Sequence, residues 1–427
     1  MHSTSPTPAV CSPTPPRRGD SAGLASLTDW TAVVRTHLPH LSPAVVTVLA
    51  LWSFGMVVAQ SCGLTTVACT VAQLLGKKES AARQQLREWC YDKVDKRGRH
   101  RQDWDVTTCF GPLLTWVLTW WDPHEQRLAL AMDATTLGQR CTVLAISVVY
   151  RGCAIPVAWT VVGAHETGRW RPHWEALFTQ LRGHVPAGWV VLVCADRGLY
   201  ARWLYRHIVS VGWHPFLRIN RGGLFRVPGR VWWRPLLSVV PLPGHGWRGR
   251  VICFKGQPLE CTLVARWDAP HKEAWLILTD LDPELAEASW YSLRAWIECG
   301  FKDTKSGGWH WDHTKMTDPA RAQRLWLAIA VATLWVLSAA RTEEEPTPAS
   351  GVPEIPWATS DRVQTSRRSR PRLISIFRRG VLTILVALIK GEGVVVGRLR
   401  PEPWPQGTPV QAVTFSDDTP SFAQAVA

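Results

Sequence analysis

Residues 189–196 read WVVLVCAD, an uninterrupted apolar run that ends in an acid. A run of this length and composition predicts a strand that is buried on both faces of a sheet. Residues 127–133 read RLALAMD and repeat the pattern, again with an acid at the end. If the two strands are neighbours, Asp133 and Asp196 lie together at one edge of the sheet.

The segments around these strands predict a mixed α/β sheet. Residues 141–150 and 153–163 are rich in β-branched side chains, and Arg151-Gly152 between them predicts a hairpin turn. After the hairpin we expect a helix, a strand, a helix and a strand, over residues 170–184, 189–196, 200–211 and 215–220. This order is typical of a ribonuclease H-like sheet flanked by helices.

Changes in composition divide the chain into seven predicted segments. Residues 221–288 are rich in Gly, Pro and Trp and alternate short strands with turns, which predicts an antiparallel β insertion. The seven segments are a Pro-rich disordered arm (1–25), a helical domain that we expect to bind DNA (26–122), the first part of the α/β core (123–220), the insertion (221–288), the second part of the core (289–341), a linker (342–371) and a small C-terminal tail, helical or β over 372–399 (372–427).

Charge favours a polyanionic partner. Lys and Arg number 48 against 34 Asp and Glu, a net charge of +14. Charge alone does not separate nucleic acid from an anionic membrane surface. A basic amphipathic segment over residues 74–90 carries Arg83 and Arg87 beside Gln84 and Gln85. It lies in a DNA groove or is an ordinary surface helix, and the sequence supports both interpretations equally.

Two apolar stretches raise the question of a membrane. Residues 41–76 contain no Asp, Glu, Lys or Arg and are long enough to cross a bilayer. They also contain Pro43, Gln60 and Gly63, which predict two buried helices with a turn at residues 61–63. The apolar run over 325–340 is shorter and predicts a core helix. We therefore expect no membrane partner.

The cysteines point to a reducing compartment. The chain has 11 of them, scattered and without a CxxC pair. An odd, unpatterned set predicts reduced thiols rather than a disulfide framework or a zinc site. The N-terminus is rich in Pro, Ser and Thr and lacks an apolar signal region, so we expect a cytoplasmic protein.

One stripe of charged side chains follows the insertion. Drawn as a single helix at 100° per residue, residues 289–305 place five polar side chains within an arc of about 80°: Tyr291, Arg294, Glu298, Lys302 and Lys305. The opposite side carries Leu293, Trp296 and Ile297, which we expect to pack inward. One carboxylate among three cations and a tyrosine suits a site that holds a metal ion and a phosphate backbone together. The alternative is a solvated face with i,i+4 pairs such as Arg294–Glu298.

Asp133, Asp196 and Glu298 together predict a metal site. A single Asp at a strand end is more often a turn former or a helix cap. Three clustered carboxylates repel one another and are costly unless cations neutralise them. Hard oxygen ligands select Mg²⁺ or Mn²⁺ over zinc. Two such ions about 4 Å apart activate a water or a 3′-hydroxyl and stabilise the leaving oxygen of a phosphodiester.

The spacing Tyr291-x2-Arg294-x3-Glu298-x6-Lys305 matches the Tyr/Arg/Glu/Lys signature of the fourth large family of bacterial insertion-sequence transposases. The chain also resembles that family in Asp133 (MDATT), in Asp196 (CADRG) and in its β insertion before the glutamate. The resemblance covers roughly residues 125–340. It is weak for the N-terminal helices and absent for the C-terminal tail.

The resemblance implies a DDE transposase with a ribonuclease H-like core. It assigns Asp133, Asp196 and Glu298 to Mg²⁺ or Mn²⁺, with two ions expected. It assigns Tyr291, Arg294 and Lys305 to the phosphates of the terminal repeat; Lys302 is added from the helical geometry alone. The implied partners are double-stranded DNA, as element ends and as target, and a second copy of the chain in a synaptic complex. The implied location is the bacterial cytoplasm, in association with the nucleoid.

Other residues stay open at this point. Relatives stack a flipped base on an aromatic side chain of the β insertion, and the candidates here are Trp232, Trp233, Trp247, Trp267 and Trp275. His310, Trp311 and His313 are candidates for DNA contacts but are more often structural. His165, Glu166 and His173 are irregularly spaced for a metal site. The rival functions are a ribonuclease H-like nuclease without strand transfer, an inactive DNA-binding remnant and a membrane protein.

Overall fold

A computed structural model describes residues 18–97, 103–166, 168, 170–269, 271–340 and 374–413, without the side chains of 18–24. Most of the predicted arm and the linker over 342–371 lie outside the described residues. The first helix, α1 (Arg18–His37), already includes residues 18–25. The prediction of disorder is therefore wrong for that end of the arm, because the helix-compatible run from Arg18 continues into the apolar segment that anchors it.

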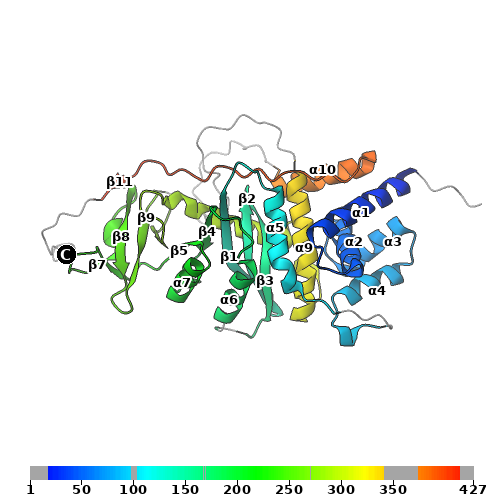
Figure 1. Cartoon of the computed structure of the whole chain (residues 1–427), viewed down its shortest axis with the longest axis horizontal. Helices are drawn as coiled ribbons and strands as arrows, with labels where there is room; N and C mark the ends of the chain where they lie inside the picture. Colours follow the sequence, from blue (N-terminus) through cyan, green and yellow to red (C-terminus); the bar gives the residue numbers. More distant parts are fainter. Residues whose placement is uncertain are drawn as a thin grey trace, which may run out of the picture.

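One mixed sheet runs through most of the molecule (Figure 1). Its strands are hydrogen-bonded in the order β3-β2-β1-β4-β5-β10-β9-β8-β6-β7, and β11 pairs with β8 beside this path. The strands are β1 (Arg127–Leu137), β2 (Cys141–Tyr150), β3 (Cys153–Gly163), β4 (Val190–Ala195), β5 (His214–Arg218), β6 (Leu224–Arg226), β7 (Arg234–Pro235), β8 (His245–Cys253), β9 (Leu259–Arg266), β10 (Trp275–Thr279) and β11 (Gln411–Ala412).

The first five strands form a ribonuclease H-like sheet, as the sequence predicts. β1 pairs antiparallel with β2, and β2 pairs antiparallel with β3. β1 also pairs parallel with β4, which pairs parallel with β5. The hairpin between β2 and β3 turns at Arg151 and Gly152, which both have positive φ angles (46° and 78°). Two such residues are what the tight two-residue hairpin requires.

Helices cover this core sheet and position the second half of the site. α6 packs on β3 and β2, α7 packs on β5, and both α5 and α9 pack on β3. α8 packs on β3, β1 and β2. These helices are α5 (Phe110–Trp120), α6 (Arg171–Leu181), α7 (Arg202–Ser210), α8 (Trp296–Thr304) and α9 (Pro319–Ala339). Within the described ranges, five 3₁₀ segments connect the elements: η1 (Lys93–Asp95), η2 (Val106–Cys109), η3 (Leu236–Val239), η4 (Ala288–Ala295) and η5 (Trp311–His313).

The β insertion is a continuation of the core sheet. Its strands β8, β9 and β10 pair antiparallel in series, as expected. The last of them also pairs with β5, through Ile277 opposite Arg218 and Leu278 opposite Leu217. Because β5 belongs to the core, hydrogen bonds run without interruption from the core into the insertion. The chain then returns from β10 through η4 to the helix that carries Glu298.

Five helices of the described part of the chain pack at the other end of the molecule (Figure 1). They are α1, α2 (Pro43–Ala59), α3 (Leu64–Leu75), α4 (Glu79–Trp89) and α10 (Ile376–Lys390). α2 and α3 meet at an angle of 98°, which confirms the predicted pair of helices with a turn at 61–63. The basic segment over 74–90 is not one helix, because Gly76 ends α3 with a φ of +59° and α4 begins three residues later.

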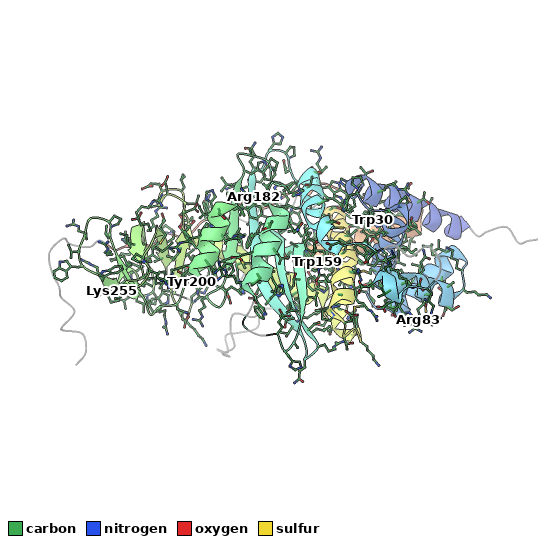
Figure 2. All side chains as sticks on the ribbon, turned by 60° about the horizontal axis from the view of Figure 1, so that its bottom comes forward. Trp30, Arg83, Trp159, Arg182, Tyr200 and Lys255 are labelled. Carbon is green, nitrogen blue, oxygen red and sulfur yellow. The ribbon has the colours of Figure 1, made fainter. Side chains whose placement is uncertain are left out.

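By length and composition, α9 is the one described helix that alone could cross a membrane, and the bent α2–α3 pair passes the same test only as a unit. In α9, 94% of this apolar window is buried inside the protein. α2, α10 and β3 cover it, and its Trp335 stacks on Trp30 at 4.2 Å between ring centroids. Trp30 and Trp159, which are labelled in Figure 2, are both fully buried. α9 is therefore packed as a core helix, as the sequence predicts for residues 325–340.

After α10 the chain forms a C-terminal strap, residues 391–413, which runs back along the molecule from the helical end to the insertion (Figure 1). Leu399 is fully buried and bridges to Trp121. Ser289 Oγ donates a hydrogen bond to the carbonyl oxygen of Pro405 at 2.7 Å. The strap ends at β11, parallel to β8. The predicted helical or β tail is thus one helix followed by an extended segment.

Candidate active site

The sheet register brings Asp133 and Asp196 to the same level. The last pair between the parallel strands β1 and β4 is Ala131 opposite Cys194. Asp133 lies two residues after Ala131, and Asp196 lies two residues after Cys194. β4 ends before Asp196, as predicted. β1 does not end at Asp133 but continues to Leu137, because β2 keeps pairing with it as far as Cys141. The two acids therefore lie where β1 and β4 part.

Backbone hydrogen bonds orient both carboxylates. Asp133 Oδ1 accepts from the N–H of Ala134 at 2.8 Å. Asp196 Oδ1 accepts from the N–H groups of Gly198 and Leu199, at 2.9 and 3.1 Å. This is the side-chain turn that Asp commonly forms after a strand. In both residues the backbone takes Oδ1 and leaves Oδ2 to contact the helical segment opposite.

That helical segment is not the single α-helix predicted over 289–305. Residues 288–295 form the 3₁₀ helix η4, and α8 begins only at Trp296. Serine hydroxyls compete with helical hydrogen bonding here: Ser292 Oγ donates to the carbonyl oxygen of Ser289 at 2.8 Å, and the Ser289 hydroxyl is taken by the strap. Because side chains three residues apart eclipse in a 3₁₀ helix, Tyr291 and Arg294 still share one side.

Arg294 joins the three acids. Its Nη2 lies 2.6 Å from Asp133 Oδ2 and 3.6 Å from Asp196 Oδ2, and its Nη1 forms an ion pair with Glu298 Oε1. The side chain of Arg294 is 13% exposed and that of Asp133 17%, whereas Asp196 and Glu298 are about one-third exposed (37% and 34%). Two strands and one helix therefore deliver their carboxylates to a single guanidinium.

Burial dominates the electrostatics of this cluster. It raises the pKa of Asp133 to about 6, although Arg294 and the Ala134 N–H both oppose the shift. Burial also acts against the charge of Arg294, yet Asp133 and the other anions around it leave the pKa of Arg294 above its usual value. Three carboxylates and one guanidinium sum to −3 + 1 = −2 when all are ionised. The remaining negative charge is available to a further cation.

The donor set fits a hard divalent ion. Every group that the three acids offer is a carboxylate oxygen, the ligand type of Mg²⁺ and Mn²⁺. Two of the three residues are about one-third exposed, so an ion and a substrate phosphate can approach from that side. These residues could hold metal at the place that the guanidinium of Arg294 now occupies.

The other predicted site residues differ in exposure. Tyr291 is only 5% exposed, and its ring packs edge-on against Trp275 at 5.3 Å between centroids. Burial raises the pKa of Tyr291 well above its usual value. Lys302 is exposed on α8, and Lys305 is half-buried just past its end, where burial lowers the pKa of its amine. Tyr291 thus packs into the protein, while Lys302 faces solvent.

Two features of the site have no local signal in the sequence. Sequence reasoning identified Arg294–Glu298 as a possible i,i+4 pair but did not anticipate that Arg294 also contacts Asp133, which lies 161 residues away. It also did not anticipate that Ser289, at the start of η4, is held by Pro405 of the strap. Both depend on contacts between distant segments.

Residues 170–335 match the transposase DDE domain. The matched segment contains Asp196 and Glu298 and begins after Asp133, and it covers less than half of the chain. Transposase DDE domains generally depend on divalent metal ions and act on phosphodiester bonds. The match therefore agrees with the carboxylate cluster. It supports a transposase-type nuclease or transferase activity for this segment.

No curated protein matches the chain. Among solved structures, the chain is similar to a piggyBac transposase chain in a cryo-EM structure of the synaptic complex with hairpin DNA. The identity is 11%, the TM-score is 0.36, and the alignment covers 74% of this chain and 73% of that chain.

Proposed function

We propose that this chain is a DDE transposase of an insertion sequence. It binds the terminal inverted repeats and catalyses metal-dependent hydrolysis and strand transfer of phosphodiester bonds. The observation that carries the proposal is the convergence of Asp133, Asp196 and Glu298, from three separate elements, on one guanidinium. Such a cluster is costly to build and serves no evident packing role.

In this proposal the three carboxylates hold Mg²⁺ or Mn²⁺, with two ions expected. When bound, the ions activate a water or a 3′-hydroxyl and stabilise the leaving oxygen. The chain's own contribution is geometric. The backbone N–H groups at Ala134, Gly198 and Leu199 fix the two aspartates, and α8 presents Glu298 from the other side. The rigid sheet edge holds the carboxylate oxygens in the fixed positions that an in-line displacement requires.

Arg294 has two alternative partners in this mechanism. In the DNA-free protein it forms ion pairs with the acids and compensates one of their three charges. When metal and DNA bind, the guanidinium of Arg294 leaves the carboxylates and binds a phosphate of the DNA. A guanidinium can bind a phosphate bidentately, as it can a carboxylate. Lys302 and Lys305 extend the phosphate contacts along and beyond α8. Tyr291 was expected to contact DNA directly; its burial supports a role in holding η4, and with it Arg294, in place.

The partner in this proposal is double-stranded DNA, both as element ends and as target, bound by two copies of the chain in a synaptic complex. The net charge of +14 favours such a partner. Basic side chains occur at both ends of the molecule, as Arg83 and Lys255 illustrate (Figure 2). The helical region over 26–122 is assigned to end recognition. The location that fits this activity is the bacterial cytoplasm, in association with the nucleoid.

Exposure distinguishes the five tryptophans that are candidates for receiving a flipped base. Of the five tryptophans considered in the insertion, Trp232 is exposed, at 74%, while the other four are partly buried. An exposed ring can receive a base by stacking, which is worth about 1–3 kcal/mol per base. We therefore assign this role to Trp232 within the proposed function.

The decisive experiment is a plasmid excision assay with Glu298→Gln, which keeps the shape of the side chain but removes its charge. Loss of excision with retained binding to an end-containing duplex supports the proposal. The matched control is Glu284→Gln, since Glu284 is an exposed acid 14 residues before Glu298 in the chain. Excision that persists in Glu298→Gln would show that the Glu298 carboxylate is not part of the mechanism.

The unaltered protein distinguishes the rival functions in the same assay. Nicking without strand transfer would favour a nuclease, and DNA binding without nicking would favour an inactive remnant.

A further inference from the structure

A second group of metal-ligating side chains lies in the turn that follows α8. Residues 308–313 read GWHWDH and lead into η5. His310, Asp312 and His313 each offer a ligand atom, and these three atoms lie within 4.8 Å of one another. This turn cluster contains none of the three acids of the candidate active site.

Two polar atoms of the turn cluster are buried without a partner. His310 Nδ1 and Asp312 Oδ1 have no hydrogen bond to any described residue, and water does not reach either atom. A buried polar atom without a partner loses its hydration and gains nothing in return. A ring nitrogen and a carboxylate oxygen left in this state, two residues apart in the chain, are what a bound cation would satisfy.

The backbone holds the cluster in a strained form. His310 has a φ of +55°, in the left-handed region that favours glycine. Its N–H donates to the carbonyl oxygen of Lys305 at 2.9 Å, and the N–H of His313 donates to the His310 carbonyl at 3.0 Å. Trp309 and Trp311, both almost fully buried, anchor the turn on either side. Strain that the surroundings enforce is typical of ligand-binding turns.

We propose that His310, Asp312 and His313 bind one zinc ion, with water as the fourth ligand. Two imidazoles and one carboxylate form the donor set that zinc takes in three-residue sites, and nitrogen ligands disfavour Mg²⁺. The two rings now stack at 5.0 Å between centroids, so one must turn for both nitrogens to face the ion. His313 can do this, because its side chain is 72% exposed.

The ion would stiffen a junction rather than take part in catalysis. Through its hydrogen bond to Lys305, the turn fixes the chain just past α8. Through Trp309, whose carbonyl accepts from the N–H of Cys62 at 2.7 Å, it is joined to the turn between the N-terminal helices α2 and α3. A bound zinc therefore ties the end of the helix that carries Glu298 to the N-terminal helices.

The test uses the full-length protein, stripped with a chelator and titrated with Zn²⁺ by calorimetry. We expect one tight site per chain, and at least about 10–100-fold weaker binding in His313→Ala, the size of loss known even for residues that only support a ligand. Asp312→Asn should behave alike. His124→Ala is the matched control, since His124 is exposed and far along the chain from the cluster. Circular dichroism checks that each variant folds.

Co²⁺ as a second probe separates this site from the cysteines. A nitrogen and oxygen site gives weak visible bands without the intense near-ultraviolet charge-transfer band of a thiolate site. Zinc affinity that is the same in the unaltered protein, His313→Ala and Asp312→Asn would overturn the proposal, and so would a thiolate band. Glu298→Gln should leave the zinc titration unchanged, so a failure of the transposase proposal would not affect this result.

Discussion

The candidate active site and the turn cluster differ in how the charges and polar atoms of their side chains are compensated, although Glu298 of the first lies only 12 residues before His310 of the second. In the first, three carboxylates are compensated by the protein's own Arg294. In the second, a buried nitrogen and a buried oxygen have no partner among the described residues. An internally compensated site must give up an ion pair before it binds a metal, whereas the turn cluster gives up only the stacking of the His310 and His313 rings and the 3.6 Å contact between His313 and Asp312. The two sites should therefore differ in metal choice and in how DNA affects that choice.

The largest effect is expected for Asp133→Asn. Asp133 lies before the segment that matches the transposase DDE domain, so its role rests on the register between β1 and β4. Loss of one metal-binding carboxylate should lower excision by at least about 1,000-fold, the scale seen when a main electrostatic group is removed. Plasmid excision and DNA binding are both measured, for the variant and for the unaltered protein. Asp29→Asn, a change at an exposed acid, is the control, and comparable excision in both variants would refute the assignment.

Stability should depend on pH through Asp133. Burial raises its pKa from 3.8 to about 6 in the folded protein. The folded state therefore holds the proton more tightly than the unfolded state, and the free energy of unfolding falls as pH rises between about 4 and 6. A shift of this size corresponds to about 3 kcal/mol. Denaturant titrations at pH 4 and pH 7 measure it.

Asp303 contributes a similar slope and must be separated. Asp303 lies on α8, the helix that carries Glu298, and it accepts a hydrogen bond from the thiol of Cys153 at 3.6 Å. Burial raises the pKa of Asp303 to about 6 as well. Asp133→Asn should remove one part of the pH dependence and Asp303→Asn the other. If the slope is the same in the unaltered protein and in both variants, the titrating groups lie elsewhere.

Arg294→Gln breaks the internal compensation. Without metal, the three carboxylates then repel one another, and the free energy of unfolding should fall by about 2 kcal/mol, somewhat less than for a fully buried pair. Mn²⁺ should bind the DNA-free variant about tenfold more tightly than the unaltered protein, since it no longer displaces a guanidinium.

Paramagnetic titration of Mn²⁺ and thermal unfolding test both parts of this prediction. Arg83→Gln is the control, because Arg83 is exposed on α4 (Figure 2). Weaker Mn²⁺ binding in Arg294→Gln would mean that the arginine supports the metal site rather than competing for it. The active site would then not differ from the turn cluster by holding a cation that competes with the metal.

The contrast also shows what the sequence can predict. The two acidic strands and the hairpin at Arg151-Gly152 follow from local patterns of apolar and turn residues, and the structure confirms those elements. The pairing of β10 with β5, which joins the insertion to the core, has no local signal. The C-terminal strap contains Pro401, Pro403 and Pro405 and shows no periodicity, so its course depends on the surfaces that it meets.

For the side chains of the site, too, one part of the arrangement follows from the sequence and the other part depends on tertiary contacts. That Glu298 lies on a helix beside Arg294 follows from their spacing, but the 3₁₀ form of η4 depends on serine hydroxyls and on a contact with the strap. The inward position of Tyr291 likewise depends on Trp275 in the last strand of the insertion. Spacing predicts which residues share a side, and tertiary packing decides which of them reach solvent.

The smallest effect is expected for Lys305→Ala. If Lys305 contacts one phosphate, the plot of log binding constant against log salt should flatten by about one counterion, with affinity for element ends lowered a few-fold. Because Lys305 is half-buried and burial lowers its pKa, its contribution to DNA binding should fade as the pH becomes alkaline. Fluorescence anisotropy between about 50 and 200 mM salt measures the slope, with Lys390→Ala on α10 as the control. A slope equal to that of the unaltered protein would place Lys305 outside the DNA interface. Its fixed position beside His310 would then matter for the turn cluster alone.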